Sequence, residues 1–105
     1  MHEDTPIVRI RRENKMLHAI FLGHKATVEE ARNVILEKGW IPLSAGDLAQ
    51  LKRYKFHFTL VAPEIDKGRV AALVQIEGKS SDFQYFVPEC AWSERVAFGA
   101  LEYSN

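Results

Sequence analysis

The sequence predicts a single α+β domain over residues 1–105, arranged as a two-layer sandwich. A mixed or antiparallel sheet of about five strands is expected to pack against two or three helices that lie mainly on one face. Two observations predict this class. Residues 26–42 have the period and the ends of a helix, whereas residues 55–61 and 83–87 alternate between apolar and polar side chains as strands do. A chain of 105 residues also fits one hydrophobic core.

The charge balance excludes strong long-range attraction to nucleic acid or to an anionic membrane. Lysine plus arginine and aspartate plus glutamate each number 14, and the pI is about 6.9. Low repulsion between copies favours self-association, and we expect a homodimer. Cys90 is the only cysteine and the start of the chain lacks a signal peptide, which together predict a cytoplasmic protein without an internal disulfide. No apolar run has the length of a membrane span.

The first part of the chain is expected to form two strands. Residues 1–5 are polar and predict a flexible arm. Residues 8–11 alternate between aliphatic and arginine side chains, a pattern typical of an outer strand. Residues 16–22 are apolar on both faces apart from His18, which predicts a strand in the middle of the sheet.

The helix that follows is the most clearly marked element. Thr27 and Glu30 have the spacing of a capping box, in which each side chain pairs with the backbone N–H of the other residue. Apolar residues then recur on one helical face. Gly39 can adopt the left-handed conformation that ends a helix, which lets Trp40 fold back onto Ile35.

The middle of the chain is expected to hold a short helix and a strand. Ser44, with Asp47 three residues later, predicts the beginning of the helix. Residues 55–61 have the two-residue period of a strand that ends at Pro63. A right-handed connection would place this strand parallel to the strand at 16–22. An open-faced, ferredoxin-like arrangement is the closest standard architecture.

The second half of the chain contains further strand patterns. Residues 66–68 predict a turn and residues 70–76 a strand, so a hairpin is expected. A helix over residues 69–77 is the alternative, because alanine and leucine are good helix formers. Residues 83–87 predict another strand. Residues 89–103 fit a helix, which we favour, but they also fit a strand.

The string His57-Phe58-Thr59-Leu60 is the most specific short motif in the chain. It resembles the His-x-Thr-hydrophobic signature of the two-histidine phosphoesterases, and the resemblance implies that His57 acts in acid–base catalysis while the Thr59 hydroxyl binds phosphate. Alternate residues of a strand project from one face and could meet the same phosphate. That family carries the string twice, so a dimer of this chain would supply the second copy. The structural alternative is the polar face of an amphipathic strand.

Basic and aromatic residues alternate just before this motif. Lys52, Arg53 and Lys55 lie beside aromatic residues in the sequence. Proteins bind single-stranded nucleic acid with this combination, because cations neutralise phosphates and rings stack on bases. If Phe56 and Phe58 point into the core instead, the basic residues are an ordinary solvated surface.

Aromatic residues are numerous for so small a domain and predict an interface. We expect Tyr85, Phe86 and Trp92 to form it, because Phe86 would face outward if Phe83, Tyr85 and Val87 face inward. The alternative is that the helix expected at the end of the chain covers Phe86. No cofactor or metal site is expected, since no phosphate-binding loop or metal-ligand spacing occurs. The leading hypothesis is a self-associating module for protein interaction or ligand binding. A phosphate-ester or nucleotide enzyme and a single-strand nucleic-acid binder are the alternatives.

Overall fold

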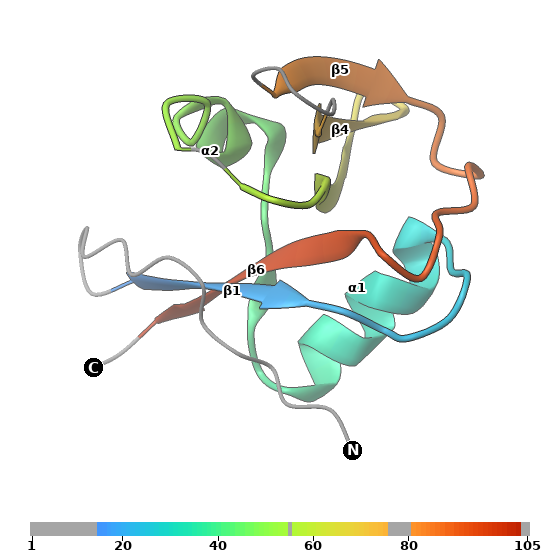
Figure 1. Cartoon of the computed structure of the whole chain (residues 1–105). Coiled ribbons are helices and arrows are strands. Elements are labelled where there is room, and N and C mark those ends of the chain that lie inside the picture. The colour runs from blue at the N-terminus through green and yellow to red at the C-terminus, as the bar shows by residue number, and fades with distance from the viewer. Residues whose placement is uncertain (1–14, 55, 76–80, 104–105) are drawn as a thin grey trace.

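A six-stranded mixed sheet and two short helices make up the structure, a computed structural model that describes residues 15–54, 56–75 and 81–103 (Figure 1). In chain order the elements are β1 (Lys15–Ile20), α1 (Val28–Glu37), β2 (Ile41–Pro42), α2 (Ala45–Ala49), β3 (Leu60–Asp66), β4 (Arg69–Val74), β5 (Asp82–Phe86) and β6 (Ala97–Tyr103). The predicted α+β class is confirmed. The expected arm at 1–5 and outer strand at 8–11 lie outside the described residues.

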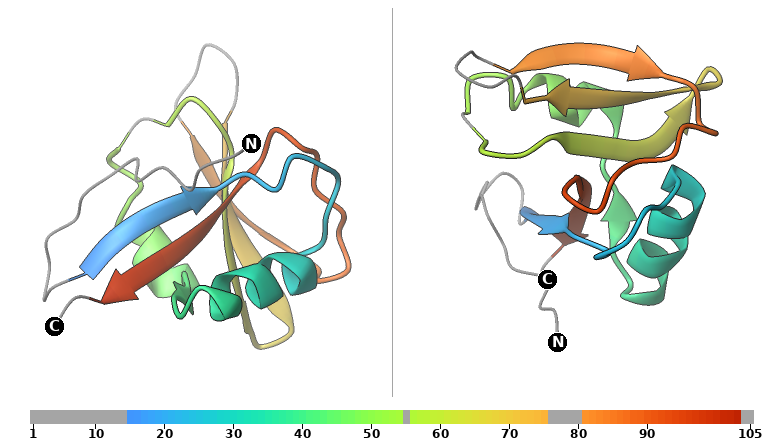
Figure 2. Two further views of the ribbon diagram at one scale, coloured as in Figure 1. Left: turned by 90° about the horizontal axis from the view of Figure 1, so that it is seen from below. Right: turned by 45° about the vertical axis from the view of Figure 1, so that its right-hand side comes forward.

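The C-terminal strand lies inside the sheet. The strands follow the order β1-β6-β3-β4-β5, and β2 pairs with β6 as well. β3 and β6 are parallel, whereas the other neighbouring strands are antiparallel. In the left view of Figure 2 the β1–β6 pair crosses the β3–β4 hairpin at a steep angle, so the sheet is strongly twisted.

This order corrects the predicted neighbours of the first strand. The pattern at 16–22 indicated a central strand parallel to the strand expected at 55–61. Instead, β1 stands at one end of the strand order in the described sheet and pairs with β6. β6 occupies the place between β1 and β3, which excludes the ferredoxin-like arrangement. Both faces of β1 are nevertheless covered, since Leu17 and Ile20 on opposite sides of the strand are buried in different clusters.

The two helices lie on opposite faces of the sheet, although the sequence suggested mainly one face. Val28 on α1 packs in one cluster with Val61, whereas Leu48 on α2 packs in another with Leu60. Neighbouring residues of a strand point to opposite faces, so each helix covers a different side of β3. Figure 1 shows α2 above β6 and α1 below it. No helix in the described ranges is long and apolar enough to cross a membrane.

The ends of α1 are as predicted. The Thr27 hydroxyl accepts from the Glu30 N–H at 3.5 Å, and the Thr27 N–H donates to the Glu30 carboxylate at 3.3 Å. Gly39 has φ +78°, and the Trp40 N–H donates to the Ile35 carbonyl at 3.1 Å. The chain therefore reverses at Gly39, and Trp40 packs against the cluster that contains Ile35.

The strand predicted at 55–61 begins later than expected. Phe56 is buried outside any strand, and β3 runs from Leu60 to Asp66. The burial of loop aromatics produces the same alternating pattern as a strand. Pro63 lies inside β3, although proline has no backbone N–H to donate to a neighbouring strand. It is tolerated because the pairing of β3 with β4 is irregular between Ala62 and Asp66.

The β3–β4 hairpin is confirmed, and the helix considered over 69–77 is wrong. Lys67 and Gly68 have φ of 54° and 76°, as a two-residue turn between antiparallel strands requires. β4 is paired with β3 on one side and with β5 on the other. Residue 76 and the rest of that expected strand end lie outside the described residues.

The helix favoured over 89–103 is also wrong, since the end of this segment forms β6. Phe98 and Ala100 point to one face and Ala97 and Leu101 to the other, and all four are buried. A strand buried on both faces lacks the polar alternation that would distinguish it from a helix.

Candidate interaction surfaces

β5 is the last strand of the described sheet. It pairs with β4 and with no other described strand, so one edge of its backbone has no strand partner there. Tyr85 is 55% exposed and Val87, just after the strand, is 60% exposed. An unpaired strand edge with exposed apolar side chains can pair with another chain. Of the predicted interface residues, Tyr85 is therefore the one that is accessible.

Phe86 and Trp92 instead support this strand from inside. Their rings meet edge to face with centres 4.8 Å apart, and Trp92 is buried. The backbone N–H of Trp92 donates to the Ala26 carbonyl at 2.7 Å, and the backbone N–H of Ala26 donates to the Trp92 carbonyl at 3.0 Å. The segment after β5 thus covers the face on which Phe86 lies, and the expectation that Phe86 faces outward is wrong.

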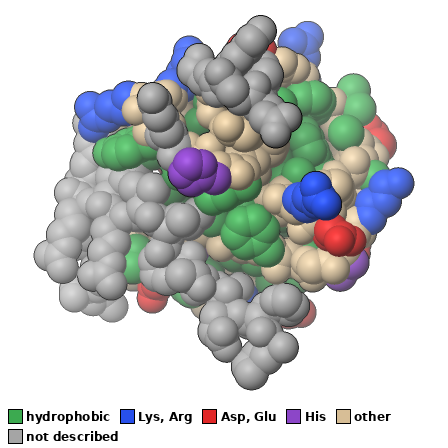
Figure 3. All heavy atoms as spheres, in the orientation of Figure 1, with side chains coloured by type: hydrophobic (Ala, Val, Ile, Leu, Met, Phe, Trp, Pro, Cys, Tyr) green, Lys and Arg blue, Asp and Glu red, His purple; other side chains and the backbone are tan. Residues whose placement is uncertain are grey.

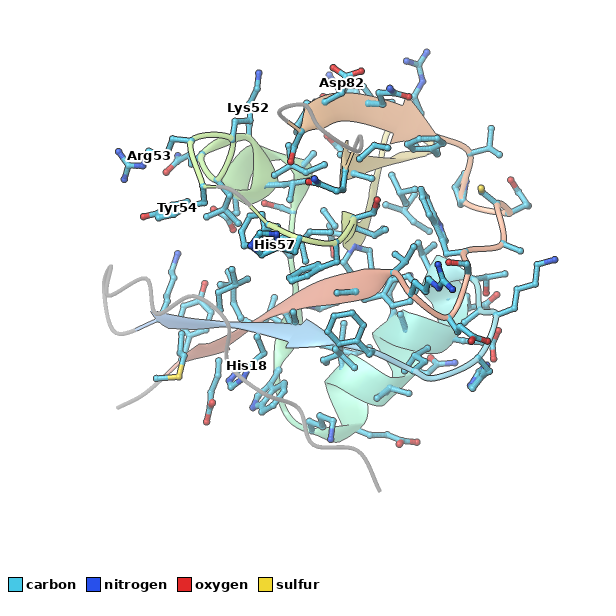
Figure 4. The ribbon with its side chains drawn as sticks, viewed as in Figure 1. His18, Lys52, Arg53, Tyr54, His57 and Asp82 are labelled. Atoms are coloured by element: carbon cyan, nitrogen blue, oxygen red, sulfur yellow. The ribbon has the colours of Figure 1, made fainter. Side chains whose placement is uncertain are left out.

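A second surface joins the loop after α2 to the neighbouring strands. We call it the basic–aromatic surface and define it as Phe21, Lys52, Arg53, Tyr54, Phe58 and Phe83. The Lys52 ammonium lies 5.5 Å from the centre of the Phe83 ring. The Arg53 guanidinium lies 5.4 Å from the centre of the Tyr54 ring. Both basic side chains are exposed, and Figure 4 shows both projecting away from α2.

Three rings of this surface, Tyr54, Phe58 and Phe21, form a row together with the buried Phe56. Tyr54 contacts Phe56 with centres 6.4 Å apart, Phe56 contacts Phe58 at 5.5 Å, and Phe58 contacts Phe21 at 5.3 Å. Phe56 is buried and anchors the row, whereas the other three rings are partly accessible. Of the predicted nucleic-acid residues, Arg53 therefore stands at one end of this row, over Tyr54, whereas Lys52 lies over Phe83 on β5. Lys55 lies outside the described residues.

His57 and Thr59 do not lie on a strand. They belong to the loop before β3, so the alternation that would aim both at one phosphate is absent. His57 is exposed, whereas the Thr59 hydroxyl accepts from the Gln75 N–H at 3.1 Å and so fixes the loop to the segment after β4. Figure 4 labels His57 between α2 and β6, and Figure 3 shows that hydrophobic side chains are exposed on this face of the molecule. The geometry gives the phosphoesterase hypothesis no additional support.

A buried histidine forms a site that the sequence did not predict. The His18 ring is stacked on Trp40 with centres 3.9 Å apart and planes 3° from parallel. Its Nε2 lies 2.7 Å from the Glu102 carboxylate, and its buried Nδ1 has no hydrogen-bond partner in the described structure. His18 opposes Ala100 in the β1–β6 register, two residues from Glu102. The one available signal was a lone polar residue in an apolar strand.

The other reactive groups in the described part of the chain do not assemble into a site. No group of three or more histidine, cysteine or acidic residues that could hold a metal occurs among the residues the structure describes. Cys90 is free and half-buried, and its Sγ contacts the carbonyl of Ala91 at 3.8 Å. Comparison with protein-family models, with curated proteins and with solved structures found no match to this chain. The surfaces must therefore be interpreted from their own geometry.

Proposed function

We propose that the protein is a small cytoplasmic interaction module that self-associates through the outer edge of β5. One observation carries the proposal: this edge has no strand partner in the described sheet and presents the exposed Tyr85 and Val87. The zero net charge is consistent with it, because copies of the chain do not repel one another strongly. A single cysteine, which remains free, fits a reducing compartment.

Two copies of β5 can pair around a two-fold axis at Gln84. Antiparallel pairing there places Phe83 of one copy opposite Tyr85 of the other, so aromatic residues meet across the new strand pair. Asp82 then lies opposite Phe86 rather than another aspartate, which avoids like-charge repulsion. Within one copy the Phe83 and Tyr85 rings already meet edge to face, with centres 5.4 Å apart.

The test measures molar mass by light scattering during size-exclusion chromatography over a range of protein concentrations. The unmodified protein is expected to be a dimer, and Tyr85→Lys combined with Val87→Lys a monomer, because lysine on an edge strand opposes pairing with a second strand. Phe86→Asp is unsuitable, since Phe86 packs on Trp92 and its loss would damage the monomer.

The matched control is Leu36→Lys. Leu36 is also 55% exposed but lies on α1, so this variant removes a similar apolar surface away from β5. It should remain a dimer. A monomeric unmodified protein at every concentration, or a β5 variant that stays dimeric, would rule out assembly through this edge.

A further inference from the structure

The basic–aromatic surface carries two exposed cations, Lys52 and Arg53. The acidic residues that adjoin its described residues in the chain are Asp47 on α2 and Asp82, which precedes Phe83 on β5. Lys52 and Arg53 project away from α2, so a phosphate can approach both of them from solvent (Figure 4). Their attraction acts over about 10 Å at moderate ionic strength.

The basic side chains are displayed over aromatic rings. Lys52 lies over Phe83, and Arg53 lies over Tyr54. Figure 4 shows Lys52, Arg53 and Tyr54 pointing outward from the same end of the molecule. These contacts hold the cations near the rings while both side chains stay exposed to solvent.

The aromatic row extends this arrangement along the surface. From Tyr54 it continues through the buried Phe56 to Phe58 and then to Phe21, which is accessible at the end of β1. The row therefore offers several rings next to one cationic end, where Arg53 lies over Tyr54. An isolated phosphate would use the cations but not the rings, and an apolar ligand would use the rings but not the cations.

We propose that the basic–aromatic surface binds single-stranded nucleic acid. Lys52 and Arg53 neutralise successive phosphates, and unpaired bases stack on the Arg53–Tyr54 pair and on the accessible rings of Phe58 and Phe21. A duplex hides its base faces, so this surface favours single strands over duplexes. The surface shares Phe83 with β5, but its cations and the other rings come from the chain outside that strand, and binding does not require self-association.

The experiment titrates the full chain into three fluorescein-labelled probes, a 20-nucleotide oligothymidylate, a 20-nucleotide oligouridylate and a 20-base-pair duplex. Binding is measured by fluorescence anisotropy at several salt concentrations. The test variant combines Lys52→Gln with Arg53→Gln. Its matched control combines Lys67→Gln with Arg69→Gln at the β3–β4 turn, the end of the hairpin opposite to Leu60 and Leu73. Both variants lower the net charge by two, so they separate a local site from general electrostatic attraction.

We expect the unmodified protein and the control to bind both single strands more tightly than the duplex. The test variant should bind at least about tenfold more weakly at low salt, and the slope of log K against log salt should fall by about 1.4, the value for two lost phosphate contacts on a single strand.

A third variant, Tyr54→Leu, keeps an apolar side chain in the partly buried position and removes the stacking ring. It should weaken binding about fivefold or more without changing the salt slope. Absence of binding at low salt, equal binding of duplex and single strands, or equal losses in the test and control variants would each overturn the proposal.

Discussion

At the scale of single residues, Gly99 lies where the packing leaves no room for a side chain. A β-carbon added to Gly99 would lie 2.6 Å from Leu43 Cδ2 and 3.0 Å from Leu43 Cβ, and the Leu43 N–H donates to the Gly99 carbonyl at 3.0 Å. We expect Gly99→Ala to lower the free energy of unfolding by about 1–3 kcal/mol, because the core around Leu43 must shift. Urea unfolding followed by circular dichroism measures this change.

Gly46→Ala is the control for that substitution. Gly46 lies on α2, and the only atom near its added β-carbon is the Ser44 Oγ, at 3.9 Å. Alanine should stabilise this exposed helical position by up to about 1 kcal/mol. If Gly99→Ala left the free energy of unfolding unchanged or raised it, as Gly46→Ala should, the close packing of Leu43 on β6 would be incorrect.

His18 shows what a sequence pattern can and cannot indicate at this scale. The apolar residues around it correctly predicted a buried strand, and the histidine stood out as the exception. Its partners were not predictable, because Trp40 and Glu102 come from distant parts of the chain and meet His18 only through the β1–β6 register and the turn after α1. Stacking and the contact with Glu102 compensate for burying a polar ring.

At the scale of elements, α1 owes its beginning to local chemistry. Thr27 and Glu30 satisfy two backbone groups that the first turn leaves unpaired. We expect Thr27→Ala to lower the free energy of unfolding by about 1 kcal/mol, whereas Thr27→Ser should be close to neutral because serine retains the hydroxyl. Chemical denaturation of both variants gives the comparison. Equal stability of the alanine and serine variants would contradict a capping role.

Elements with local signals were predicted, and elements defined by distant packing were not. The capping box of α1, the Ser44 cap of α2 and the turn at 66–68 each depend on residues within a few positions of one another. By contrast, Phe56 alternates with polar neighbours as a strand residue would, yet it is a loop residue held in the core by contacts with Tyr54 and Phe58. Periodicity reports burial, and burial does not require a strand.

At the scale of the whole molecule, the sheet order could not be inferred from the sequence. β6 enters between β1 and β3, so the last strand of the chain completes the centre of the sheet. β6 shares only two residue pairs with β3, Leu60 with Ala97 and Val61 with Phe98, whereas it pairs with β1 over six. Because β3 and β6 are joined over so short a length, the sheet can twist sharply between them. The two helices cover opposite faces of this sheet. The candidate surfaces lie on loops and an outer strand that this arrangement positions.

Self-association through β5 also predicts how the whole molecule unfolds. If the folded dimer unfolds to two separate unfolded chains, the melting temperature rises with protein concentration, because assembly stabilises the folded state by mass action. Above the dissociation constant we expect an increase of about 3–5 °C for each tenfold increase in concentration, given the unfolding entropy of a chain of this size. Differential scanning fluorimetry or calorimetry over two decades of concentration measures it. The Tyr85→Lys, Val87→Lys variant should melt at one temperature throughout, whereas Leu36→Lys should retain the slope. A concentration-independent melting temperature for the unmodified protein would mean that the edge of β5 does not join copies of the chain in solution.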